Sequence, residues 1–76
     1  MSITEAKKYL RTRFAEYGLT QERVAADILN TDPATLSRYM TGRTKWPHWA
    51  IQMLIEHFDI PKEAVYAVFI EPFVSK

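Results

Sequence analysis

The 76-residue sequence contains no cysteine, only two glycines and no apolar run long enough to cross a membrane. Small secreted domains usually depend on disulfides, so the missing cysteines favour a reducing compartment. The first ten residues, MSITEAKKYL, lack the apolar segment of a signal peptide. We therefore expect a cytoplasmic protein without a membrane span.

The sequence also lacks the residue patterns of common catalytic and metal sites. It contains no nucleophile elbow, no glycine-rich phosphate loop and no paired carboxylates. His48 and His57 are nine residues apart, without cysteine or convergent carboxylates to complete a metal site. Glu56 precedes His57 directly, and adjacent side chains on a helix point apart. We expect neither an enzyme nor a bound metal or cofactor.

Composition is that of one ordinary folded domain covering residues 1–76, with 47% hydrophobic and 25% charged residues. Aromatic residues make up 13% of the chain and can fill much of so small a core. Trp46 and Trp49 flank Pro47 and His48, where they could stack on exposed bases. Their spacing favours the simpler interpretation that both pack over the core.

Charge is unevenly distributed although the net charge is only +1. Residues 1–45 carry eight basic and five acidic side chains, whereas residues 46–76 carry two basic and four acidic ones. The segment from Leu36 to Lys45 has three basic residues and no acidic residue. This clustering predicts either a basic binding surface in the middle of the chain or an ordinary solvated face.

Capping residues and apolar periodicity predict five short helices and no strand. Ser2 and Glu5 form a capping box that opens the first helix, and Gly18 ends it. Thr20 caps the second helix, and residues 30–31 form a turn. Asp32 caps the third helix, which begins with Pro33 and ends at Gly42. The side chains expected to point inward are Val24, Ala25, Ile28 and Leu29 in the second helix and Leu36, Tyr39 and Met40 in the third.

Prolines open the last two predicted helices. Pro47 precedes the fourth helix, and Pro61 precedes the fifth, which Pro72 is expected to stop. The expected inward residues are Ala50, Met53, Leu54 and Phe58 in the fourth helix and Val65, Tyr66, Val68 and Phe69 in the fifth.

Two short helices joined by a tight turn, the second led by small polar residues, are typical of a helix-turn-helix. The segment LTQERVAADILNTDPATLSRYMTG resembles the helix-turn-helix of the Cro and phage-repressor family, also called the Xre type. Family members commonly contain TQ, then LA, a turn and a string like TISRIENG. The matching positions are Thr20-Gln21, Val24-Ala25 and the run from Thr35 to Gly42. The resemblance implies an all-α, lambda-repressor-like DNA-binding domain with its helix-turn-helix at about residues 20–42.

The resemblance also implies roles for individual residues. Gln21 would contact a phosphate, the outer face of the third helix would enter the major groove, and the following loop would touch the DNA backbone. Arg38 would be the principal base reader, because arginine pairs with guanine in a bidentate manner. The implied DNA-binding residues are Gln21, Ala34, Thr35, Ser37, Arg38, Arg43, Thr44 and Lys45. The implied function is a Cro-like transcriptional regulator that binds double-stranded operator DNA in a phage or prophage switch, in the cytoplasm of a bacterial host.

A second hypothesis is that the chain binds a partner repressor protein, as modulators of repression and antirepressors with this fold do. Asp32 and Pro33 stand where the family often has polar residues aimed at bases, and Met40 replaces the glutamate that usually pairs with an arginine, here Arg13. The residues implied in partner binding are Asp32, Pro33, Tyr39 and Met40. The apolar tail containing Ile70, Phe73 and Val74 either folds back on the first helix or joins two subunits in a weak homodimer.

Overall fold

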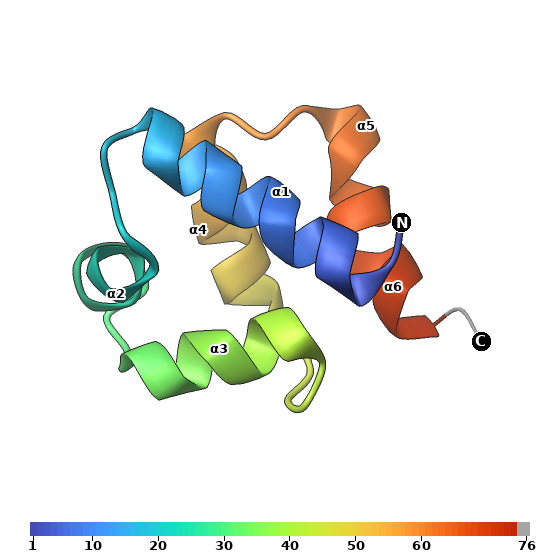
Figure 1. The fold of residues 1–76 in the computed structure, drawn as a ribbon, viewed down its shortest axis with the longest axis horizontal. Coiled ribbons are helices and arrows are strands. Elements are labelled where there is room, and N and C mark those ends of the chain that lie inside the picture. The colour runs from blue at the N-terminus through green and yellow to red at the C-terminus, as the bar shows by residue number, and fades with distance from the viewer. Residues whose placement is uncertain (75–76) are drawn as a thin grey trace.

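Residues 1–74, described by a computed structural model, form five helical segments and contain no strand (Figure 1). The first, third and fourth segments are α1 (Ile3–Glu16), α3 (Pro33–Thr41) and α4 (His48–Phe58). The second consists of α2 (Gln21–Arg23) and the π-helical turn η1 (Val24–Ile28). The fifth consists of α5 (Lys62–Val65), the π-helical turn η2 (Tyr66–Ile70) and α6 (Glu71–Val74). The predicted all-α class with five helices is confirmed.

The predicted ends of α1 are confirmed by their hydrogen bonds. The Glu5 N–H donates to Ser2 Oγ at 3.1 Å, and the Ser2 N–H donates to Glu5 Oε1 at 2.8 Å. The hydrogen bond from the Ser2 N–H favours the ionised carboxylate and lowers the pKa of Glu5. At the other end, Gly18 has a φ of 74°, the left-handed conformation that glycine adopts without strain.

The core lies between α1, η1, α3, α4 and the C-terminal segment, and two aromatic groups join several of these elements. The Phe58 ring of α4 lies 4.9 Å from Phe14 and 5.1 Å from Tyr17 between ring centroids. Trp46 lies 5.3 Å from Tyr39 and 5.1 Å from Phe69, which connects α3 to η2. Offset and edge-on aromatic pairs of this kind add to the stabilisation from apolar burial. Within the described part of the chain, every helix is too short or too polar to cross a bilayer.

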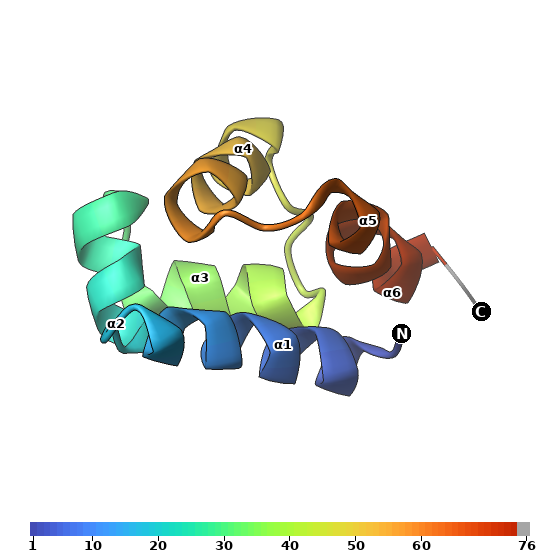
Figure 2. The ribbon, with the colours of Figure 1, turned by 90° about the horizontal axis from the view of Figure 1, so that it is seen from above.

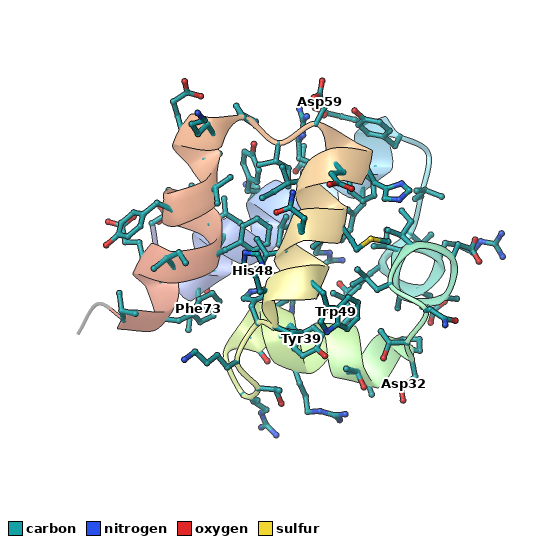
Figure 3. All side chains as sticks on the ribbon, turned by 180° about the vertical axis from the view of Figure 1, so that it is seen from behind. Asp32, Tyr39, His48, Trp49, Asp59 and Phe73 are labelled. Carbon is teal, nitrogen blue, oxygen red and sulfur yellow. The ribbon has the colours of Figure 1, made fainter. Side chains whose placement is uncertain are left out.

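Three expectations about single residues are wrong. Pro72 does not stop the fifth helix but lies inside α6, directly after the widened turn η2, where a regular α-helical ladder is already interrupted. Tyr66, predicted to point inward, is 58% exposed, because the inward stripe of this segment follows Val65, Val68 and Phe69 at a spacing of three and four residues. Trp46 is buried as expected, whereas Trp49 is 50% exposed on the first turn of α4 (Figure 3).

The apolar tail packs back on the body of the protein. A Cβ atom at Gly42 would lie 3.0 Å from the Phe73 ring and 3.4 Å from Ile3, so these three residues meet at one point. The N-terminal amino group donates to Glu71 Oε1 at 2.6 Å and ties α6 to the start of α1. Of the two alternatives for the tail, the structure therefore contains the fold-back on α1.

Candidate nucleic-acid interface

The turn between η1 and α3 is formed without glycine. Asn30 adopts a φ of 53°, a left-handed conformation that asparagine tolerates better than most residues. The Thr31 N–H donates to the Ala25 carbonyl at 2.8 Å and closes the turn. In Figure 1, α2 and η1 run along the line of sight while α3 runs across the view, so the two helices cross as in a helix-turn-helix.

The N-terminal end of α3 is fixed by Asp32. Its carboxylate accepts a hydrogen bond of 2.7 Å from the Thr35 N–H, and Pro33 occupies the first helical turn as predicted. The hydrogen bonds from Thr35 lower the pKa of Asp32, and nearby Arg38 lowers it further. Asp32 lies at the leading end of α3 (Figure 3), which therefore carries an ionised carboxylate at neutral pH.

The expected inner face of α3 is confirmed, since Leu36, Tyr39 and Met40 are all buried. Burial of this stripe turns Ala34 and Arg38 to solvent and leaves Thr35 and Ser37 half-buried at its margins. Arg38 Nη2 donates to Thr35 Oγ1 at 3.1 Å, one turn toward the N-terminus. The guanidinium is therefore held along the exposed face of the helix, near its leading end.

The loop after α3 folds back on the same helix. Gly42 ends α3 with a φ of 82°, and the Arg38 carbonyl then accepts hydrogen bonds from the Arg43 N–H at 3.0 Å and the Thr44 N–H at 3.2 Å. Arg43, Thr44 and Lys45 are all exposed. Two backbone hydrogen bonds thus place the basic loop directly beside the last turn of α3.

Gln21 lies at the start of α2, beside α1. It is the first residue of α2 and is half-buried, and the preceding Thr20 caps the helix by accepting from the Arg23 N–H at 3.2 Å. A hollow of ≈ 220 Å³ contains Gln21, Thr20 and Arg11 of α1 in its lining. Gln21 therefore lies beside α1, apart from the loop that carries Arg43 and Lys45.

The residues expected at a partner-binding surface do not share one. Asp32 and Pro33 are exposed at the start of α3, whereas Tyr39 is only 8% exposed and Met40 only 1%. Tyr39 and Met40 belong to the core stripe that holds α3 on the protein, so their placement at a docking surface is wrong.

Arg13 has a structural role that the sequence did not reveal. Its Nη2 donates to the carbonyl oxygens of Phe58 and Asp59, the latter at 3.0 Å, and its Nη1 pairs with Glu16 at 3.3 Å. Arg13 thus caps the C-terminal end of α4, where unpaired carbonyls attract a cation. No local pattern signals this contact, because Arg13 and Phe58 are 45 residues apart in sequence.

The two histidines lie at opposite ends of α4, one in its first turn and one in its last. No three acidic or histidine side chains within residues 1–74 are placed to hold a metal ion together.

No protein-family model, no curated protein and no solved structure matches this chain. Its resemblance to the Cro and phage-repressor family therefore depends on the residues of the helix-turn-helix segment and on the five-helix pattern of the chain.

Proposed function

We propose that the chain is a sequence-specific DNA-binding transcriptional regulator of the Cro and repressor type, acting in a phage or prophage switch in a bacterial cytoplasm. The observation that carries the proposal is the outer face of α3, which is free of core contacts along Ala34 and Arg38. The major groove of B-DNA is about 12 Å wide and admits one α-helix. With its small side chains, this face allows the helix backbone to come close to the base edges.

Base reading is assigned to Arg38. The hydrogen bond to Thr35 Oγ1 directs its guanidinium toward the end of α3 that leads into the groove in helix-turn-helix proteins. A guanidinium there can donate two hydrogen bonds to O6 and N7 of guanine. Asp32, ionised at the same end, can accept from N4 of cytosine and repels phosphate.

Phosphate contacts are assigned to both flanks of α3. The loop carrying Arg43, Thr44 and Lys45 lies at the C-terminal flank, and Gln21 lies at the start of α2. Such contacts fix the position of the helix in the groove without carrying sequence information.

The alternative is a modulator of repression that binds a partner repressor instead of DNA. The ionised carboxylate of Asp32 at the leading end of α3 favours it, because a negative charge there opposes phosphate. Burial of Tyr39 and Met40 speaks against it, since these residues cannot contact a partner without unpacking α3.

The test is selection of binding sites from a randomised duplex pool, followed by titration of the enriched duplex against point-changed duplexes. One changed contact base pair should lower affinity by about 5- to 160-fold, since a mismatch costs about 1–3 kcal/mol. Absence of binding to any duplex at low salt, with capture of a co-encoded repressor, would establish the modulator instead.

A further inference from the structure

A basic groove runs along α1 and reaches the last turn of α3, outside the surface described above. It has a volume of ≈ 750 Å³. Three basic side chains and three threonines supply its polar lining, which consists of Lys7, Lys8, Arg11, Thr4, Thr12 and Thr41. No acidic residue lines the groove in the described part of the chain.

The acidic residues of α1 are engaged elsewhere. Glu5 accepts the hydrogen bond of the capping box, and Glu16 pairs with Arg13 on the side of the helix that faces α4. Within residues 1–74, none of the ion pairs involves Lys7, Lys8 or Arg11. Among the described residues, the groove therefore presents three positive charges with no carboxylate in its lining.

The groove reaches α3, the helix to which DNA reading is assigned above. Figure 1 and Figure 2 show the N-terminal half of α1 near the C-terminal end of α3, and Thr41 from the last turn of α3 is part of the groove's lining. At the other end, Arg11 also lines the hollow that contains Gln21. Arg11 is therefore the one residue that lines both hollows.

We propose that this groove binds the phosphate backbone of the DNA strand that borders the major groove on the α1 side. Lys7 and Arg11 lie one turn apart on one face of α1, about 6 Å along its axis. A DNA strand carries one phosphate every 3.4 Å or so along the duplex axis, so two phosphates two positions apart are separated by about 6.8 Å, a spacing that two long, flexible side chains about 6 Å apart can reach. The Arg43–Lys45 loop would hold the opposite strand. The inference rests on the proposed function, because it assumes that α3 lies in the major groove.

The test is a salt titration of fluorescence anisotropy with a labelled duplex, using the wild type and the variants Lys7→Ala, Arg11→Ala and both together. Lys62→Ala is the matched control, since Lys62 is exposed on α5, away from α3. Removal of one phosphate contact should reduce the slope of log affinity against log salt by about 0.9. When the salt is raised from about 50 to 200 mM, both proteins lose affinity. The loss should be about 12 times greater for the wild type than for the double variant, because the double variant has two phosphate contacts fewer.

The expected result also includes an unchanged preference for the enriched duplex over a scrambled one, because phosphate contacts carry no sequence information. A double variant with the slope of the wild type and of Lys62→Ala would overturn the groove assignment and leave the DNA-binding function standing. Failure of the wild type to bind any duplex would overturn both. As a competition control, polyglutamate and unlabelled duplex DNA are each added at equal charge concentration. If polyglutamate displaced the labelled duplex as effectively as unlabelled DNA does, the groove would be a site for acidic proteins, and the proposal would be overturned.

Discussion

Replacement of Arg13 by alanine should destabilise the fold by about 2 kcal/mol, although Arg13 lies on the surface of α1. Its guanidinium donates to the carbonyls of Phe58 and Asp59 at the end of α4. A hydrogen bond involving a charged group contributes about 1.5–3 kcal/mol. The side chain is 25% exposed, and its Nε is buried without a hydrogen-bond partner in residues 1–74. Both facts reduce the stabilisation, so the loss of free energy of unfolding for the two hydrogen bonds together should lie near the low end of that range.

The assay is thermal unfolding followed by circular dichroism. For a chain of this size, each kcal/mol shifts Tm by about 4–8 °C, so Arg13→Ala should lower Tm by about 8–16 °C. Arg13→Met retains the aliphatic stem and should be destabilised nearly as much, because the hydrogen bonds and not the packing are removed. Arg11→Ala removes the same charge from the same helix and should shift stability by less than about 0.5 kcal/mol. Equal destabilisation of the Arg13 and Arg11 variants would refute capping of α4 by Arg13.

Three further predictions concern α3 and its ends. Arg38→Ala should cost about 1–3 kcal/mol of binding free energy on the enriched duplex and relax the preference at one base pair. Lys45→Ala should instead weaken binding to the enriched and the scrambled duplex equally and reduce the slope of log affinity against log salt by about 0.9. Both are measured by fluorescence anisotropy. Gly42→Ala should lower the free energy of unfolding by about 1–2 kcal/mol, because φ is 82° at this position and the new Cβ would lie 3.0 Å from Phe73. A denaturant titration measures this, and an unchanged midpoint would contradict the packing of the tail. Because the pKa of Asp32 is lowered, its ionised carboxylate stabilises the folded state fully at pH values above the ordinary carboxyl pKa of 3.8, and this stabilisation is lost as the pH falls below that value. The wild type should therefore lose stability more steeply in acid than Asp32→Asn, as measured by unfolding at a series of pH values.

Helix ends were predictable from sequence wherever a local hydrogen bond or a left-handed residue defines them. Ser2 with Glu5, Asp32 with Pro33, and Gly42 each act within four residues, and the structure confirms all of them. The inner face of α3 was equally predictable, because a spacing of three and four residues places its apolar side chains on one stripe.

Features set by tertiary packing were not predictable in the same way. The π-turn η2 interrupts the α-helical ladder ahead of Pro72, and the helical segment continues past this proline. The capping of α4 by Arg13 joins residues far apart in sequence. The groove along α1 combines side chains from two helices, so no single stretch of sequence contains its pattern.

The tail leaves one prediction for solution work. Tyr66, Ile70 and Val74 remain exposed, at 58%, 39% and 63%, after Phe73 has packed on the body of the protein. The weak homodimer, the other of the two alternatives for the tail, is tested by sedimentation equilibrium of the wild type and of Ile70→Lys. Dimerisation through this surface requires that the variant sediments as a monomer at concentrations where the wild type self-associates.

The measurement that tests the central claim most directly is amide chemical-shift mapping of the labelled chain during titration with duplex DNA at low salt. If α3 enters the major groove, the largest changes should fall on residues 34–38, on the loop 43–45 and on Gln21, while residues 66–74 stay unchanged. Changes confined to residues 66–74, or no change at any DNA concentration, would contradict DNA reading by α3.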